Sequence, residues 1–209
     1  GCKSPSSGGF QNISIIQVTD PAKRKKLVEF SRGQRFIATA PVSLVFCVDH
    51  HRAEQVIGLE PAPFRLPDQF KNLVMGIVDA SICAQTMVLA AEAEGLGSCY
   101  NGNILNVMDQ VSELLALPDR VFPVVMLTLG WPKTERRQPP KYPASLLVHE
   151  NEYRERPDET VYAAYRKQNC WQKFHPKEEW VESCCTLAER LHGAEYAARV
   201  REDIEKKGY

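Results

Sequence analysis

The chain has 209 residues, and its 26 Lys and Arg residues balance 26 Asp and Glu residues, so the formal net charge is zero. This length is sufficient for one domain with a substantial core. The balanced charge predicts no nucleic-acid partner, and no signal peptide or membrane-spanning segment is apparent. The seven Cys residues lack the spacing of a disulfide framework or a CxxC motif, which indicates reduced thiols and a cytoplasmic location.

The first quarter of the chain predicts two strands separated by helical segments. Asp20 and Pro21 are typical of a helix start, because Asp caps free N–H groups and Pro fits the first helical position. After a loop rich in Ser and Gly, the predicted elements are a strand Ile13–Val18, a helix Ala22–Phe30, a helical turn at Gln34–Ala38 and a buried strand Val42–Val48.

The stretch Phe70–Asn103 organises the rest of the chain. Between Lys71 and Glu92 only Asp79 carries a charge, and apolar residues fall on nearly every side of the predicted helix. Such a helix is buried in a core or spans a membrane, and the polar residues within it favour the core. Gly95 is well placed as the C′ residue that ends this helix in a left-handed conformation.

The elements on either side of this helix complete an α+β or α/β pattern. A polar helix from His50 to Gly58 and a Pro-rich connector, Glu60–Pro67, precede it. It is followed by a strand Ser98–Tyr100, a polar loop Asn101–Asn103, an amphipathic helix Asn106–Leu117, a strand Val121–Leu129, a basic loop Lys133–Pro143, a turn or edge strand Ser145–His149 and a charged helical tail Pro157–Tyr209.

Several familiar site motifs are excluded by their context. Gly95-Leu96-Gly97 resembles a dinucleotide fingerprint, but it follows a helix and precedes a strand, which is the reverse of the order required. His50 and His51 are adjacent and point in different directions on a helix, so they make a poor metal pair. Cys184 and Cys185, with His175 nearby in sequence, also lack metal-ligand spacing. We therefore expect no metal site.

Three loops have the character of anion- and heterocycle-binding segments. Hydroxyl groups and close backbone approach come from Ser6-Ser7-Gly8-Gly9, and backbone N–H groups come from Asn101-Gly102-Asn103. Positive charge for a phosphate comes from a third set of residues: Lys133, Arg136, Arg137 and Lys141. Each loop alone also fits an ordinary loop, turn or solvated surface. Together they suit a phosphorylated, planar cofactor.

Five segments of the sequence resemble the flavin-dependent nitroreductase family. In order they are PSSGGFQ, RGQRFIATAP, QTMVLAAEAEGLGSCYNGN, LPDRVFPVVMLTLGWP and YPASLLVHENEY, and they cover roughly residues 4–155. The resemblance is closest to the branch of oxygen-insensitive NADPH nitroreductases and NADPH–flavin oxidoreductases. It implies an α+β, FMN-binding sandwich with an antiparallel or mixed sheet flanked by helices and a long buried central helix.

The resemblance also implies a homodimer with the flavin at the subunit interface. Residues 1–155 would form the FMN-binding core, and residues 156–209 would form a helical extension that packs on the core or on the partner subunit. The implied cofactor-binding residues are Ser6 and Ser7 at the phosphate and ribityl chain, Gln11 closing that loop, Gln34 at the pyrimidine edge of the isoalloxazine, Tyr100, Asn101, Gly102 and Asn103 beside the ring, and Lys141 at the phosphate. A backbone N–H near Gly102 would approach flavin N5.

The sequence departs from the family pattern at the phosphate. The family's N-terminal helical segment, which carries a His and an Arg, has no counterpart in these 209 residues, and the family's Lys-Pro-Arg has Pro139 and Lys141 at its basic positions. The second glycine of the family's flavin loop is Asn103.

Two functional hypotheses remain open. The first is an FMN-dependent oxidoreductase that uses NADPH or NADH to reduce a small-molecule acceptor by a ping-pong mechanism, without a catalytic side chain because flavin N5 carries the chemistry. The second, from a different class, is a flavin-binding or interaction protein with little turnover.

Overall fold

The computed structural model describes residues 1–59, 69–134, 140–168 and 193–209. These residues form two compact units, which are described separately: Gly1–Lys133 with Glu195–Tyr209, and Thr134–Ala194. The expected connector Glu60–Pro67 lies outside the described residues, as do three apolar anchors of the tail, Trp171, Phe174 and Trp180. The predicted boundary at residue 155 stays a prediction.

The first unit is built on a four-stranded antiparallel sheet with the order β1-β2-β4-β3. The strands are β1 (Ile13–Gln17), β2 (Val42–Asp49), β3 (Gly97–Asn101) and β4 (Val121–Gly130). The two central strands, β2 and β4, are buried on both faces, which explains why their sequences are nearly continuous apolar runs. All four strands lie where the sequence predicts them.

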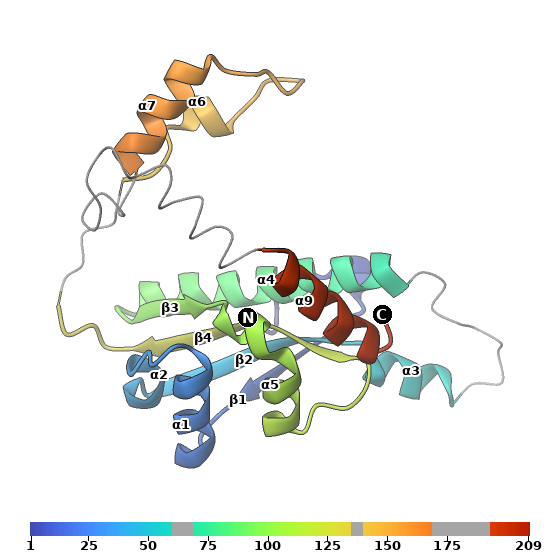
Figure 1. Ribbon diagram of the computed structural model, residues 1–209. Helices are drawn as coiled ribbons and strands as arrows, with labels where there is room; N and C mark the ends of the chain where they lie inside the picture. Colours follow the sequence, from blue (N-terminus) through green and yellow to red (C-terminus); the bar gives the residue numbers. More distant parts are fainter. Residues whose placement is uncertain (60–68, 135–139, 169–192) are drawn as a thin grey trace. The chain divides into compact units, whose positions relative to one another are not determined.

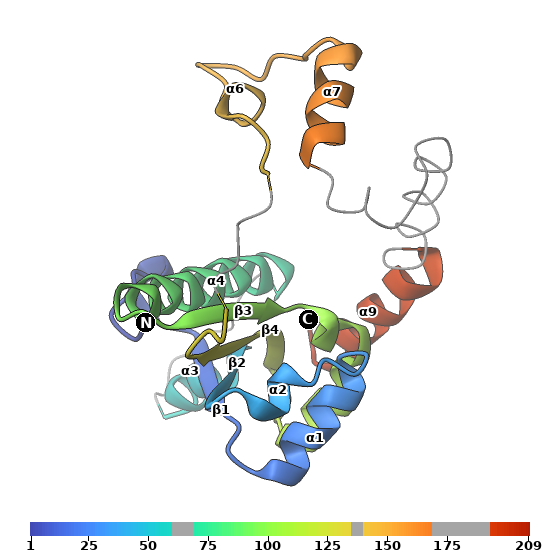
Figure 2. The same ribbon diagram turned by 90° about the vertical axis from the view of Figure 1, so that its left-hand side faces the viewer.

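Helices cover both faces of this sheet (Figures 1 and 2). The long helix α4 (Gln69–Ala93) lies on one face, where Phe46 and Leu127 point into its core. Val45 and Met126 point to the opposite face. That face is covered by α1 (Pro21–Phe30), α2 (Phe36–Thr39) and α5 (Met108–Leu115). The first unit is therefore a three-layer α+β arrangement, with the sheet between two layers of helices.

Two predicted helix boundaries are confirmed in atomic detail. The Asp20 side chain accepts hydrogen bonds from the N–H groups of Ala22 and Lys23, at 2.7 and 3.5 Å, and Pro21 occupies the first helical position. At the end of α4, Gly95 has φ +78°. The Leu96 N–H donates to the Ala91 carbonyl and the Gly95 N–H donates to the Glu92 carbonyl, which is the Schellman arrangement.

Helix α4 is buried on one face only. Its residues Ala80, Cys83 and Ala84 are fully buried against the sheet. The opposite face exposes large apolar side chains, namely Phe70, Val74, Met75, Val78, Ile82 and Leu89. The expected buried central helix is therefore buried on its sheet-facing side, and its other face is exposed in the single chain. By length and composition, α4 is the one helix in the described ranges that could cross a membrane, but its packed face and the buried Asp79 are typical of a core helix.

The remaining helices are short or lie near the C-terminus. The predicted helix Asn106–Leu117 begins as a 3₁₀ turn, η2 (Asn103–Val107), and continues as α5. The residues expected as a turn or edge strand form the short helix α6 (Ala144–Leu147). The other elements are η1 (Ser7–Gly9), α3 (His51–Ile57), α7 (Asp158–Gln168) and α9 (Ala194–Lys206).

Candidate functional site

The N-terminal loop of the predicted site folds back on itself. Gly8 and Gly9 have φ values of +57° and +72°, a region that costs little energy only for glycine. The Ser6 Oγ accepts a hydrogen bond from the Gln11 N–H at 3.2 Å. Because a serine hydroxyl has one proton to donate, this contact leaves the Ser6 O–H proton available for a ligand. Gln11 closes the loop by donating from Nε2 to the Cys2 carbonyl at 3.3 Å.

Asp79 of α4 anchors this loop. The Ser7 N–H donates to both carboxylate oxygens of Asp79, at 2.9 and 3.1 Å, and the Asp79 residue is only 4% exposed. Hydrogen bonds to a charged carboxylate are stronger than those between neutral groups. The single charge in the apolar stretch of α4 therefore fixes the backbone between the two predicted phosphate-binding serines. The sequence singles out Asp79 by its isolation but does not reveal this contact.

A second anchor comes from α3. Arg52 donates from Nη2 to the carbonyls of Gln11 and Ile13, at 2.6 and 2.9 Å, and Nη1 lies 3.5 Å from the Asp49 carboxylate. The loop is thus held on one side by α4 and on the other by α3 and the start of β1.

At the end of β3, four polar residues form a connected cluster, which we call the Asn101 network: Ser31, Gln34, Asn101 and Asn103. The Asn101 Nδ2 donates to the Gln34 Oε1 at 2.7 Å. The Asn101 Oδ1 accepts from the Asn103 N–H at 3.0 Å and from the Ser31 Oγ at 3.3 Å. Asn101 is only 3% exposed, so its side chain faces the protein interior. The structure therefore brings Gln34 together with the Tyr100–Asn103 loop, as expected from the sequence.

Gly102 lies in this loop with an ordinary backbone conformation. Its φ is −89°, which any residue adopts, and a Cβ placed on it would meet no atom within 4 Å. A need for positive φ, which is one explanation for a glycine here, is therefore wrong. Neither backbone strain nor crowding within the described chain requires this glycine. Close approach of a ligand to the exposed Gly102 backbone stays a prediction.

Tyr100 precedes this loop and connects it to α4. The residue is 41% exposed, and its hydroxyl donates to the Gln85 Oε1 at 3.3 Å. Burial, and to a smaller degree the nearby Cys83, raises the pKa of Tyr100, so it stays a neutral phenol at physiological pH. Helix α4 therefore carries anchor points for both loops, Asp79 and Gln85, about 9 Å apart along the helix axis at 1.5 Å per residue.

The predicted phosphate cations are described less completely. Lys133 ends the first unit as an exposed side chain, and Lys141 is exposed in the second unit. Because the units are described separately, no distance relates Lys141 to the N-terminal loop. Arg136, Arg137 and Pro139 lie outside the described residues. So do His175, Cys184 and Cys185; among the described residues, no three His, Cys, Asp or Glu side chains come together as metal ligands.

These groups fit an FMN molecule chemically. Hydroxyl donors on an anchored, glycine-containing loop suit a phosphate, a fixed amide suits the polar edge of the ring, and the exposed Gly102 backbone suits a planar face or edge. The fit rests on the donors and on the space beside Gly102.

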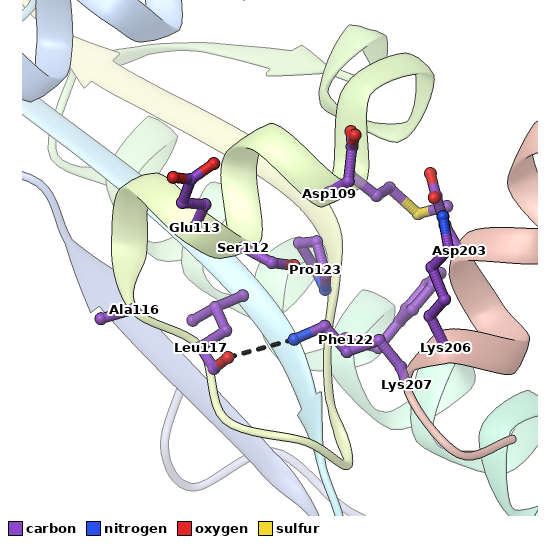
Figure 3. Close-up of a pocket in the computed structure, with 11 residues that line it drawn as sticks. Asp109, Ser112, Glu113, Ala116, Leu117, Phe122, Pro123, Asp203, Lys206 and Lys207 are labelled. Atoms are coloured by element: carbon purple, nitrogen blue, oxygen red, sulfur yellow. Dashed lines mark hydrogen bonds between the residues drawn. The ribbon is translucent and has the colours of Figure 1, made fainter.

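A separate cavity of about 310 Å³ lies between α5, the start of β4 and α9 (Figure 3). Its lining combines the side chains of Phe122 and Leu117 with Asp203 and Lys206 of α9 and with Lys207, which follows α9. The Lys207 Nζ donates to the Leu117 carbonyl at 3.1 Å, which is the dashed contact in Figure 3. None of the predicted cofactor-binding residues lines this cavity.

Comparisons with known proteins agree with the fold. The Nitroreductase family matches residues 2–131. An oxygen-insensitive NADPH nitroreductase of Salmonella typhimurium is 41% identical over 167 residues, which are 79% of this chain and 67% of that protein. An FMN reductase (NAD(P)H) of Bacillus subtilis is 32% identical over 213 residues, which are 99% of this chain and 84% of that protein.

A solved structure extends the similarity to three dimensions. The NADPH:FMN oxidoreductase of Vibrio harveyi, complexed with NAD+, superposes with a TM-score of 0.77 at 31% identity and covers 95% of this chain and 84% of that one. The family match spans more than half of the 209 residues. This chain therefore belongs to the nitroreductase family.

Proposed function

We propose that this protein is an FMN-dependent oxidoreductase that uses NADPH or NADH to reduce nitroaromatics, quinones or flavins in a two-electron, ping-pong reaction. Family membership supports this proposal, as do relatives named as NADPH nitroreductase and FMN reductase. The observation that carries it is the exposed backbone of Gly102, which lies beside the fixed amide of Gln34 and has no reason within the chain to be glycine.

The chain's own residues bind and orient the cofactor. Ser6, Ser7 and Gln11 form the phosphate and ribityl loop, and Lys141 contributes a cation at the phosphate. Gln34 and the segment Tyr100–Asn103 hold the ring. Bound FMN supplies the two-electron chemistry, so no side chain has to act as a nucleophile. The backbone N–H near Gly102 and the Gln34 amide are fixed donors that favour negative charge on the ring.

The exposed apolar face of α4 supports a homodimer. Phe70 and Leu89 are 70% and 60% exposed, and Val74, Val78 and Ile82 continue the same stripe between them. Contiguous apolar surface of this kind marks an interaction site in a protein that remains in solution. A second copy of the chain is the partner we propose, because two such stripes are self-complementary across a twofold axis.

A cytoplasmic location is part of the proposal. The thiols of Cys47 and Cys83 are buried and unpaired, and burial raises the pKa of Cys47 to about 12, so it is an inert thiol. Buried reduced thiols are typical of proteins from reducing compartments.

The cofactor test uses the purified chain titrated with FMN, followed by anaerobic addition of NADPH or NADH. We expect tight binding with quenching of flavin fluorescence and bleaching of the yellow colour by at least one donor. Binding without bleaching would favour the alternative of a flavin-binding protein with little turnover. Absence of binding after reconstitution would contradict the proposal.

The dimer test places a charge in the α4 stripe. Val78→Arg, at a side chain that is 44% exposed, should convert a dimer to a monomer in sedimentation velocity. Val56→Arg on α3 is the matched control, since Val56 is 60% exposed and lies off the stripe. An unchanged sedimentation coefficient for Val78→Arg, or a wild-type monomer with bound FMN, would contradict the α4 interface.

A further inference from the structure

The orientation of the Asn101 side chain is fixed by its partners. The Asn103 backbone N–H can only donate, and it lies 3.0 Å from one terminal atom of the Asn101 amide. That atom must be an acceptor, so it is Oδ1. The other terminal atom is therefore the NH₂ group, and it faces Gln34 at 2.7 Å. This assignment follows from the hydrogen-bond network and does not depend on distinguishing oxygen from nitrogen directly.

The same logic fixes Gln34. An NH₂ group approaching at 2.7 Å requires an acceptor, so Gln34 turns its Oε1 toward Asn101. The Nε2 group of Gln34 then points away from Asn101. In the described part of the chain, no hydrogen bond is assigned to this Nε2, and the Gln34 side chain is only half-buried. Gln34 is thus held with its hydrogen-bond donor group directed away from Asn101.

We propose that Asn101 is a positioning residue that makes Gln34 present its NH₂ group, and not its carbonyl, to the bound ring. This inference rests on the proposed function, because it concerns the edge of FMN that Gln34 binds. A donor at this position selects an acceptor on the ligand, such as a ring carbonyl or an unprotonated ring nitrogen. It disfavours a ligand that presents an N–H group there, because two donors would face each other.

The fixed donor also has an electronic consequence. A hydrogen bond from a protein donor to the edge of the ring is stronger when that edge carries more negative charge. The Asn101–Gln34 pair therefore favours the reduced, more negative form of the cofactor over the oxidised form. Its loss should lower the midpoint potential as well as weaken binding.

The decisive variant is Asn101→Asp. The carboxylate keeps an oxygen for the Asn103 N–H and for the Ser31 hydroxyl, but its other oxygen now faces Gln34 as an acceptor. Gln34 must then turn its NH₂ inward and its carbonyl outward. We expect the FMN dissociation constant to rise at least about tenfold, which equals about 1.4 kcal/mol. A tenfold loss of preference for the reduced form would lower the midpoint potential by about 30 mV.

Two comparisons separate reorientation from added charge. Asn106→Asp adds the same charge in η2, where the structure assigns no contact with Gln34, and should change the dissociation constant by less than about threefold, or about 0.6 kcal/mol. In a double-mutant cycle, Asn101→Asp is also measured in a Gln34→Met background, where no amide remains to turn. There its effect should fall to that of Asn106→Asp. Apoprotein melting curves check that each variant folds.

A second variant covers the case in which Asn101→Asp does not fold. Gln34→Glu accepts from the Asn101 NH₂ with one oxygen and presents the other oxygen outward, so it also replaces the outward donor by an acceptor. It should weaken FMN binding more than Gln34→Met does. Equal effects of Asn101→Asp in both Gln34 backgrounds, or Gln34→Glu binding as well as wild type, would overturn the inference. A wild-type chain that binds no FMN would instead contradict the proposed function itself.

Discussion

Two polar clusters in this molecule differ in the side chains that form them and in how far their hydrogen-bonding groups pair with one another. The Asn101 network contains only neutral side chains and leaves the Gln34 NH₂ directed outward. The second cluster, which we call the Tyr209 latch, consists of His50, Glu54, Arg120 and Tyr209 and fastens the segment after α9 to the sheet.

Most groups of the latch pair with one another or with nearby backbone, although the buried Arg120 Nη2 has no hydrogen-bond partner among the described residues. The Tyr209 hydroxyl donates to the Arg120 carbonyl at 3.0 Å, so it must accept from the His50 Nδ1–H at 2.9 Å. Arg120 donates to Glu54 at 2.7 Å and stacks over the Tyr209 ring at 4.6 Å. Burial, and then the charge of Arg120, lowers the pKa of His50, which keeps the imidazole neutral.

The difference indicates which cluster serves stability and which serves binding. A cluster whose donors and acceptors pair with one another has no group left for a ligand, so its variants should change the free energy of unfolding. A cluster with a fixed outward donor is prepared for a ligand. Its variants should change cofactor affinity and leave the apoprotein stable. Each variant below tests this separation by measuring both quantities.

The largest effect on stability is expected from Tyr209→Ala. The substitution removes a ring packed against Phe122 and leaves the His50 Nδ1 without its partner. The Arg120 carbonyl loses one of its two hydrogen bonds and keeps the one from the His50 N–H. Such a loss costs about 3 kcal/mol, which lowers Tm by about 6–12 °C in a protein of this size. FMN affinity should not change. Tyr153→Ala, at a tyrosine that is 81% exposed, is the control. Equal melting temperatures for the two variants would contradict a stabilising role of the Tyr209 latch.

The opposite pattern is expected from Lys141→Ala. One charge-assisted hydrogen bond to phosphate is worth about 1.5–3 kcal/mol, so the FMN dissociation constant should rise by about one to two decades. The apoprotein should melt normally because Lys141 is exposed. Turnover at saturating FMN should be retained, because Gln34 and the Tyr100–Asn103 segment still hold the ring. If saturated turnover fell as far as affinity did, Lys141 would not be a phosphate ligand.

Gly102→Val tests the same separation of affinity from stability at the ring of the cofactor. The backbone conformation at Gly102 is ordinary and a Cβ there meets no atom within 4 Å, so the apoprotein should keep its melting temperature. The added side chain should obstruct the ring, with FMN binding weakened at least about tenfold, equal to about 1.4 kcal/mol, and NAD(P)H-dependent reduction lost. The comparison is Gly33→Val, because Gly33 has φ +78° and should lose stability instead. Normal flavin reduction in Gly102→Val would exclude close approach of the ring.

The sequence predicts the local elements well because their signals are local. Strands β2 and β4, the Asp20 cap and the Gly95 helix end all depend on residues within a few positions of one another. The helix α4 shows the limit of this approach, since composition alone does not distinguish the face that packs on the sheet from the face left exposed.

Contacts between distant residues were beyond such reasoning. The Ser7–Asp79 and Gln34–Asn101 hydrogen bonds join residues 72 and 67 positions apart, and the Arg120–Tyr209 pair spans 89. A resemblance can assign Gln34 to a flavin edge, but only the folded network shows which end of its amide faces outward. Likewise, the choice between strain and ligand approach at Gly102 required its φ angle.

The smallest effect on stability is expected from a substitution of Asp203, a buried carboxylate in α9 close to the Tyr209 latch. This α9 carboxylate is buried, and its Oδ2 has no hydrogen-bond partner among the described residues. Burial is the main cause that raises the pKa of Asp203 above its ordinary value of 3.8. The charged groups around it are Asp109 on α5, which raises the pKa further, and Lys206, Glu202 and Arg199 on α9, of which Glu202 raises it and the two cations lower it.

A raised pKa in the folded state means that Asp203 favours folding only when it is protonated. Its favourable contribution is complete below pH 3.8 and is lost as the pH rises through the folded-state pKa. Above its folded-state pKa the ionised, unpartnered carboxylate opposes folding, and there Asp203→Asn should raise the free energy of unfolding by about 1 kcal/mol. The gain should shrink as the pH falls through the folded-state pKa, when wild type also becomes neutral. Glu205→Gln, at an exposed residue of the same helix, should show no such dependence. Chemical denaturation between pH 4 and pH 7 measures the free energy of unfolding of both variants. If Asp203→Asn were less stable than wild type at pH 7, the Asp203 carboxylate would have a stabilising partner, and the prediction would be wrong.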